Sequence, residues 1–194
     1  AVRQPGSAFK PFVYLTALQH DMTPDTTMKD QPVTYGGWSP KNAGGSYSGA
    51  MSLSDALAHS VNTIAVQLAD EVGTKNIIAN AKKMGITTLD AKDDNLAMAL
   101  GGLTRGVTPL EMASAYGTFA NKGVHVKILD RNGNVLEDSS TLEKEETKTR
   151  VMSEREAYEM TTMLEGVIDH GTGRAAAIGR PAAGKTGTTD DNKD

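Results

Sequence analysis

The chain has 194 residues, of which 38% are hydrophobic and 23% charged, and its formal net charge is −4. This size and composition fit one domain with a modest core and exclude wholesale disorder. The negative balance provides no basic surface, so a nucleic-acid partner is not expected. The absence of cysteine excludes disulfides, thiolate nucleophiles and zinc–thiolate sites. No apolar run reaches the roughly 18 to 20 residues that a membrane-spanning helix needs.

The first half of the chain combines helical patterns with one long irregular stretch. Apolar residues at helical spacing predict a buried helix over residues 7–20, with Pro11 in its first turn, where a lost backbone donor costs least. Residues 21–50 are rich in Gly, Pro, Ser and Asn and predict an irregular lobe. Three further helices are expected, over residues 52–59, 61–72 and 74–84.

The second half carries clear local start signals. A capping box with proline at the first helical position predicts a helix over residues 108–121. The turn sequence Asp-Arg-Asn-Gly predicts a hairpin over residues 124–138. The charged, non-periodic residues 139–150 predict an exposed connection, and a second capping box starts a helix over 153–168.

One segment near the end of the chain fits two motifs. Residues 179–186 match the phosphate-binding pattern G-x-x-x-x-G-K-[ST], whereas residues 185–187 match the K-T-G of serine acyltransferases. A phosphate loop needs a buried strand before it and a helix after it. Residues 174–178 are weak as a strand, and residues 187–191 are a poor, acidic helix start. The nucleotide interpretation is therefore the weaker of the two.

The acyltransferase interpretation requires partners upstream, and the sequence contains them. Ser7 and Lys10 form S-x-x-K, and a residue three positions along a helix returns to the same face. A serine nucleophile needs a neighbouring base, and burial together with a nearby cation such as Lys185 would lower the pKa of Lys10 enough to provide one. Ser60 and Asn62 form S-x-N. The Ser60 hydroxyl could relay a proton between Lys10 and a leaving amine, while the Asn62 amide holds the substrate.

The third motif would form the substrate-facing wall. We expect Lys185, Thr186, Gly187 and Thr188 to form an edge strand, on which a cation and two hydroxyls bind a substrate carboxylate. Gly187 would leave room for close approach of the backbone.

Each motif alone has an ordinary structural explanation. Ser7 and Ser60 could be helix caps, and Lys185 could be a surface charge. All three in the right order, with Pro-Gly before the first and Ala-Gly before the last, form a much more specific signal.

With these motifs the chain resembles the transpeptidase domain of the class A, bifunctional penicillin-binding proteins. The resemblance implies an α/β fold, more narrowly an α+β fold of the β-lactamase/transpeptidase type, in which a helical subdomain packs on a five-stranded antiparallel sheet. Residues 1–194 would be a partial domain, mostly the helical subdomain, with the sheet largely missing through truncation at both ends. The resemblance rests on the stretches 3–12, 35–49, 56–62, 107–116, 171–173 and 180–189.

The resemblance also implies a function, peptidoglycan D,D-transpeptidation. Ser7 would attack the D-Ala-D-Ala terminus of a stem peptide with Lys10 as the general base, and the backbone amides of Ser7 and Thr188 would form the oxyanion hole. Transfer to an amine gives a cross-link, whereas transfer to water gives carboxypeptidase activity. Partners would be stem peptides of lipid II-derived glycan strands, and β-lactams would acylate Ser7 covalently. No cofactor or metal is implied. A membrane anchor and a glycosyltransferase domain, expected outside this chain, would place it on the extracytoplasmic face of the membrane.

Other conspicuous residues have competing interpretations. Trp38 and Tyr47 fall in the lobe that borders the cleft in such proteins, and Trp38 could line the substrate path or fill the lobe's own core. His59, next to Ser60, is better explained as structural than as part of a Ser-His pair. Glu111 is better explained as a capping-box residue than as a general base.

Two rival functions stay open at this point. A β-lactamase would need a deacylating carboxylate in a Glu-x-x-x-Asn loop between the second and third motifs. The nearest candidate, Glu71 to Asn76, lies too close to Asn62. A non-catalytic domain that senses β-lactams or binds partners is the second rival.

Overall fold

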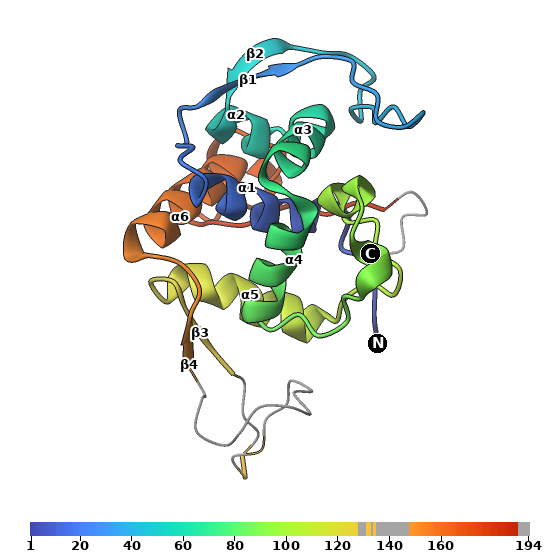
Figure 1. The fold of residues 1–194 in the computed structure, drawn as a ribbon. Coiled ribbons are helices and arrows are strands. Elements are labelled where there is room, and N and C mark those ends of the chain that lie inside the picture. Colours follow the sequence, from blue (N-terminus) through green and yellow to red (C-terminus); the bar gives the residue numbers. More distant parts are fainter. Residues whose placement is uncertain (128–130, 133, 135–147, 190–194) are drawn as a thin grey trace.

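Helices dominate the computed structural model, which describes residues 1–127, 131–132, 134 and 148–189. Figure 1 shows the helices gathered around α1, with one small two-stranded ribbon above them and another below. The elements in chain order are η1 (Gly6–Phe9), α1 (Lys10–Leu18), β1 (Thr27–Asp30), β2 (Gly49–Ser52), α2 (Leu53–Ala58), α3 (Asn62–Val72), α4 (Thr74–Lys83), η2 (Ala91–Asp93), η3 (Leu96–Leu100), α5 (Pro109–Ala120), β3 (Val124–Val126), β4 (Lys148–Arg150), α6 (Glu154–Asp169) and η4 (Arg174–Ala176).

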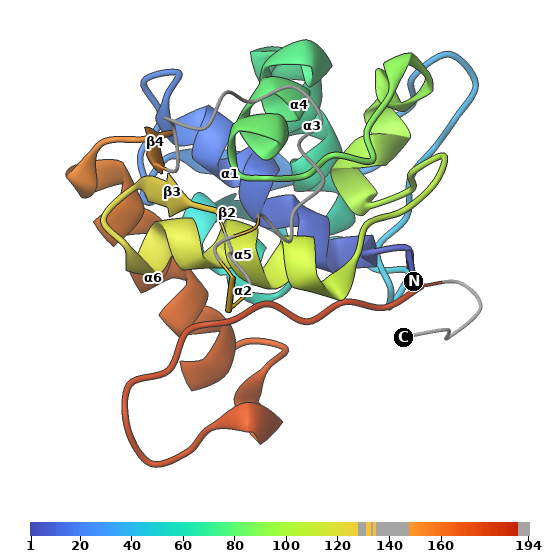
Figure 2. The ribbon, with the colours of Figure 1, turned by 90° about the horizontal axis from the view of Figure 1, so that it is seen from below.

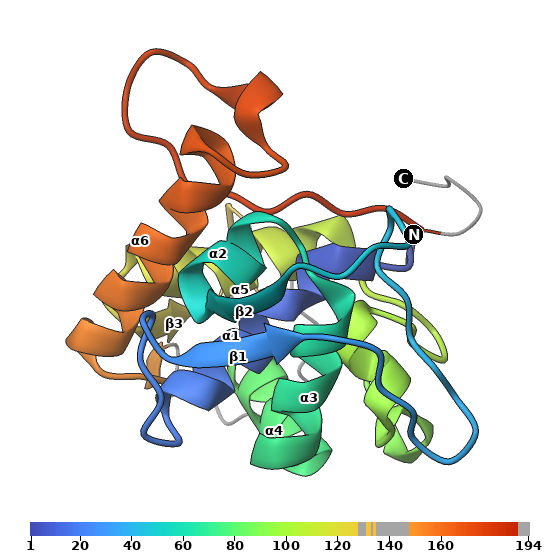
Figure 3. The same cartoon turned by 90° about the horizontal axis from the view of Figure 1, so that it is seen from above.

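The core is built around α1. All nine of its residues are buried, and it packs against α2, α3, α4 and α6 (Figure 3). A helix that is apolar on every side must be enclosed by other elements, as this one is. The predicted helix over 7–20 is present, but its first turn is the tighter 3₁₀ helix η1, and Pro11 falls in the first turn of α1. None of the helices in the described ranges is long and apolar enough to cross a membrane.

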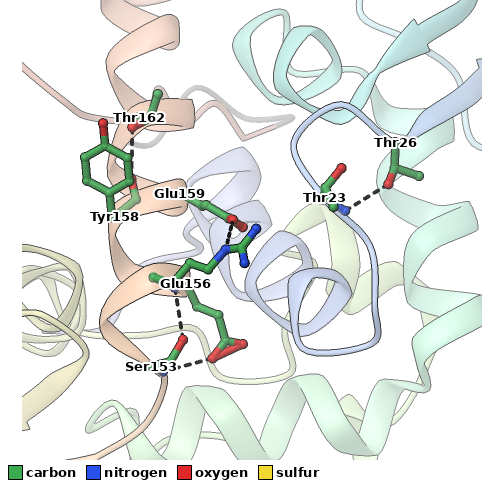
Figure 4. Close-up of polar contacts among 8 residues, drawn as sticks. Thr23, Thr26, Ser153, Glu156, Tyr158, Glu159 and Thr162 are labelled. Carbon is green, nitrogen blue, oxygen red and sulfur yellow. Dashed lines mark hydrogen bonds and ion pairs between the residues drawn. The ribbon is translucent and has the colours of Figure 1, made fainter.

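The two capping boxes predicted from sequence have different outcomes. At α6 the box is complete, because Ser153 Oγ accepts from Glu156 N at 3.1 Å and Glu156 Oε1 accepts from Ser153 N at 2.9 Å (Figure 4). At α5 only half forms: Thr108 Oγ1 accepts from Glu111 N at 3.1 Å. The Glu111 carboxylate accepts instead from the Thr87 hydroxyl, so Glu111 helps to hold the preceding loop rather than closing the box.

The predicted irregular lobe is closed by a ribbon. β1 and β2 pair antiparallel, with Thr27 opposite Ser52 and Asp30 opposite Gly49. Between them, residues 31–48 form a long loop that projects from the helical body toward the end where both termini lie (Figure 3). The β1–β2 ribbon thus forms the base of the lobe, and β2 leads directly into α2.

The second ribbon differs from the predicted hairpin. β3 pairs antiparallel with β4, so that Val124 lies opposite Arg150. The predicted exposed connection over 139–150 therefore ends in a strand. The return strand predicted at 135–136, and most of the proposed connection, lie outside the described residues.

The edge strand predicted at Lys185 to Thr188 is wrong for the described structure. Residues 177–189 run extended toward the N-terminal residues, but no ladder partner pairs with residues 185–188 among the described ranges (Figure 2). A strand is defined by backbone pairing, and here one backbone bond, from Gly184 N to Leu164 O at 3.2 Å, joins the segment to α6. The described fold is consequently helical with two short ribbons.

Candidate active site

Ser7 lies in the 3₁₀ turn that leads into α1. The turn is tight because Gly6 has a positive φ of 54° and Ala8 N donates to Pro5 O at 3.2 Å. The position before the turn, Pro5, makes no side-chain cap, and Ser7 is not a cap either. Its hydroxyl makes no hydrogen bond within the described part of the chain and lines a cleft of about 1040 Å³. Ser7 is therefore presented to a ligand.

Lys10 is fully buried at the start of α1, at 0% exposure. Its Nζ lies 2.7 Å from Ser60 O, 2.9 Å from Ser60 Oγ and 2.6 Å from Asn62 Oδ1. Burial first, and the charge of Lys185 second, lower the pKa of Lys10 to about 6. The lowered pKa matches the expectation from sequence. The amine is bonded to the S-x-N motif, and its approach to Ser7 stays a prediction.

Ser60 owes its position to the way α2 ends. Val61 N donates to Ala56 O at 3.0 Å and Ser60 N donates to Leu57 O at 3.1 Å, which is the Schellman pattern. The pattern places Ser60 in the left-handed region, with φ of 55°, where glycine is usual. A non-glycine residue there costs roughly 1–3 kcal/mol and needs its surroundings to hold it. In this conformation the Ser60 hydroxyl faces the amines of Lys10 and Lys185. Ser60 is therefore not a helix cap, which was its ordinary structural explanation.

Two amines meet at the Ser60 hydroxyl. Lys185 Nζ lies 2.9 Å from Ser60 Oγ, and burial lowers the pKa of Lys185 to about 8. At pH 7 an amine with a pKa of about 6 is mostly neutral and has two protons to donate. Three acceptors, the Ser60 carbonyl, the Ser60 hydroxyl and Asn62 Oδ1, lie within hydrogen-bond reach of Lys10 Nζ, and Lys185 Nζ also donates to the Ser60 hydroxyl. The Ser60 hydroxyl therefore links the two amines.

The third motif is held against the first by close backbone contacts. A Cβ built on Gly187 would lie 2.8 Å from Pro5 O, and one on Gly6 would collide with the Thr188 carbonyl. Thr186 Oγ1 also lies 2.7 Å from Thr172 Oγ1. Segments more than 170 residues apart in sequence are thus brought together beside Ser7, as the motif order predicted.

This placement also decides the nucleotide interpretation. Lys185 is directed at Ser60, and residues 187–189 are extended where a phosphate loop would begin its helix. Residues 179–186 consequently lack the strand–loop–helix geometry that gathers amides around a phosphate.

Two positioning contacts near the nucleophile were missed from sequence. The Gln4 side-chain amide forms two hydrogen bonds with the backbone of Leu103. Gln4 Nε2 donates to Leu103 O at 2.7 Å, and Gln4 Oε1 accepts from Leu103 N at 2.9 Å. Tyr116 Oη donates to Ala8 O at 2.6 Å and ties α5 to the turn that carries Ser7. No local pattern indicates either contact, because the partners are about 100 residues apart.

Trp38 lies at the cleft and not in a lobe core. It closes a tight turn in which Tyr35 and Trp38 exchange backbone bonds of 2.8 and 2.9 Å, with Gly36 and Gly37 both at positive φ. Trp38 is 37% exposed, whereas Tyr47 is exposed to a similar extent without lining the cleft.

The remaining candidates lie away from this centre. The His59 ring contacts Asp55 O at 3.0 Å and is exposed, which fits the structural interpretation. The Glu111 carboxylate accepts from the Thr87 hydroxyl at the start of α5, which fits a structural role for this residue too. The residues that line the same cleft as Ser7 include Gly6, Trp38, Asn62, Gly101 and Thr188.

The chain belongs to the penicillin-binding protein transpeptidase family, whose domain description matches residues 1–194. It is 39% identical over 209 aligned positions to penicillin-binding protein 1A of Neisseria meningitidis, covering 100% of this chain and 26% of that protein. The chain thus spans about a quarter of the length of this curated relative.

Solved structures give the same result. Penicillin-binding protein 1A from Haemophilus influenzae has a TM-score of 0.79 at 29% identity, covering 97% of this chain and 35% of that one. The PonA1 protein from Mycobacterium tuberculosis, in complex with penicillin V, has a TM-score of 0.77 at 26% identity, covering 100% of this chain and 55% of that one.

Proposed function

We propose that this chain carries the acyl-enzyme centre of a class A penicillin-binding protein, a serine D,D-transpeptidase of peptidoglycan synthesis. The observation that supports it most is the Ser60 hydroxyl held between Lys10 and Lys185, 2.9 Å from each amine. A neutral buried amine, a relay hydroxyl and a retained cation are what acyl transfer from serine requires.

In the proposed reaction, Ser7 Oγ attacks the carbonyl carbon of the D-Ala-D-Ala peptide bond. Its proton passes to the neutral amine of Lys10, and the backbone amides of Ser7 and Thr188 stabilise the developing oxyanion. Lys10 then returns a proton through Ser60 to the leaving nitrogen, the C–N bond breaks, and D-alanine departs. An amine of a second stem peptide takes the acyl group and restores Ser7.

The third motif would bind the substrate's terminal carboxylate. Lys185 stays largely charged near neutral pH, and Thr186 and Thr188 offer hydroxyls on the same extended segment. Gly187, tight against Pro5, keeps that segment close to Ser7. Trp38 would contact the stem peptide at the mouth of the cleft, and Asn62, held by Lys10, would contact its backbone.

Partners and location follow from the same proposal. The substrates would be stem peptides on glycan strands outside the cytoplasm, β-lactams would acylate Ser7, and a membrane anchor would lie elsewhere in the protein. The family match and the relatives named penicillin-binding protein 1A support this. The β-lactamase alternative lacks support, since neither Glu71 nor Asn76 lines the cleft and Asn76 Nδ2 is bonded to Val72 O at 2.8 Å.

The test is covalent labelling of the full-length protein with a fluorescent penicillin. Ser7→Ala should abolish labelling with an unchanged melting temperature, because Ser7 makes no hydrogen bond in the described part of the chain. Ser54→Ala, outside the cleft, should label normally. Persistent labelling of Ser7→Ala would show that another residue is the nucleophile. Rapid turnover of penicillin by the wild type would instead favour the β-lactamase.

A further inference from the structure

The first turn of α3, which carries Asn62, is capped from outside its own sequence. Val61, at the N-cap position, makes no side-chain cap. Asn42 Oδ1, from the lobe, accepts instead from Asn62 N at 3.0 Å and from Thr63 N at 3.3 Å. Free amides at a helix start need such acceptors. The lobe therefore completes the helix that presents Asn62.

Asn42 is oriented by a buried carboxylate. Asp30, 2% exposed, accepts from Asn42 Nδ2 at 2.8 Å and from Ser48 N at 2.8 Å, and it also accepts from Thr63 Oγ1 at 2.6 Å. Burial alone would raise the pKa of Asp30, but hydrogen bonds from Thr63, Asn42 and Ser48 outweigh it and lower the pKa. The carboxylate stays ionised and binds both sides of the junction between lobe and helix.

The same junction fixes the Asn62 amide. Asn62 Nδ2 donates to Lys41 O at 2.8 Å, and a carbonyl can only accept. Asn62 Oδ1 must therefore face Lys10 Nζ, 2.6 Å away. Each step, from Asp30 through Asn42 to Asn62 and Lys10, is a single hydrogen bond.

We infer that Asp30 and Asn42 are positioning residues for acylation: the lobe sets the placement of Lys10 by fixing the N-terminus of α3 and the Asn62 amide. The inference rests on the proposed function, because it concerns the base of that reaction. Asp30 is 2% exposed, and both polar atoms of the Asn42 side chain are bonded within the junction, so their role is to position other groups. Loss of Asp30 would let Asn42 turn, release two amides of α3 and loosen the Lys10 contact.

The experiment measures acylation of the full-length protein by a fluorescent penicillin, separating the acylation rate constant from the labelled fraction. Asp30→Asn should lower the rate constant by about 10- to 100-fold, the range that loss of alignment in a catalytic group produces. Thr34→Ala, in the same lobe and with its hydroxyl bonded to Ser39, should leave it unchanged. A purely structural role would reduce the labelled fraction and the melting temperature and leave the rate constant intact, which would overturn the inference.

A milder pair of variants keeps the test decisive if Asp30→Asn fails to fold. Thr63→Val preserves side-chain volume and removes one hydrogen bond to Asp30, so the rate constant should fall several-fold. Thr63→Ser restores the hydroxyl and should recover it. Wild-type rates in both variants would refute the inference. An unacylated wild type would refute the proposed function instead, so the two failures are distinguishable.

Discussion

The two halves of the candidate site are built in different ways. Lys10, Ser60 and Asn62 lie on α1 and at the α2–α3 junction, where helices and buried side chains surround them. Lys185 and Thr186 lie on an extended segment with no strand partner in the described ranges. One half is positioned by its helical framework, and the other is attached to that framework by a few contacts.

The attaching contacts are specific and few. In the described residues they include the backbone bond from Gly184 to Leu164, the amine of Lys185 on Ser60, the hydroxyl of Thr172 on Thr186, and the close passage of Gly187 past Pro5. The extended segment is therefore held by side-chain contacts, a backbone bond and the absence of a Cβ at Gly187, whereas Lys10 is held by burial within the helical framework. The two halves should therefore respond differently to pH and to substitution.

The largest contrast is expected in the pH profile of acylation by a labelled penicillin. The base must be neutral, and burial has lowered the pKa of Lys10 to about 6, so the rate should fall about tenfold per pH unit below that value. The carboxylate-binding cation must stay charged, and burial lowers the pKa of Lys185 to about 8, so the rate should fall again above it. Measurements from pH 4 to 10 should give a bell.

The substitution Lys185→Arg should distinguish the acid limb of this pH profile from the alkaline limb. An arginine keeps its charge throughout this range, so the alkaline limb should move to higher pH while the acid limb keeps its position. Because the amines share Ser60, the two apparent values belong to the pair. A flat rate between pH 4 and 7 would contradict the role of Lys10 as a neutral base.

A smaller effect is expected where the extended segment passes Pro5. Gly187→Ala would place a Cβ 2.8 Å from Pro5 O and push the segment outward, lowering the acylation rate by about tenfold through misalignment. Gly184→Ala is the matched control, because its Cβ would meet Ile168 Cδ1 at an ordinary 3.6 Å. Equal rates for the two variants would show that the close contact at Gly187 is unimportant.

Local signals account for what the sequence could predict. The Ser153 capping box and the Pro109 start define their helices within a few residues, and the motif order indicated that the third motif lies against the turn that carries Ser7, as the contacts of Gly6 and Gly187 show. These features depend on residues close together in sequence or on a recognisable pattern.

The missed features depend on distant partners. Asn42 caps a helix that starts 20 residues later, and the left-handed φ of Ser60 follows from how α2 ends against its surroundings. The strand over Lys148–Arg150 exists because β3 pairs with it, and the edge strand expected at Lys185 has no such partner in the described residues. Backbone pairing between strands depends on the tertiary structure, so the composition of one segment cannot predict it.

The smallest effect separates binding from chemistry. Thr172→Val removes the hydroxyl contact to Thr186, while the backbone bond from Thr172 N to Ala58 O, at 2.9 Å, keeps the loop in place. One neutral hydrogen bond contributes about 0.5–1.5 kcal/mol, so penicillin should bind about two- to tenfold more weakly before acylation. The acylation rate constant should not change, because Thr186 would bind the carboxylate equally in the ground and transition states. Thr172→Ser, which keeps the hydroxyl, should behave as wild type. If the rate constant falls while affinity is retained, Thr186 acts on the reacting bond, and the extended segment belongs to the catalytic half of the site.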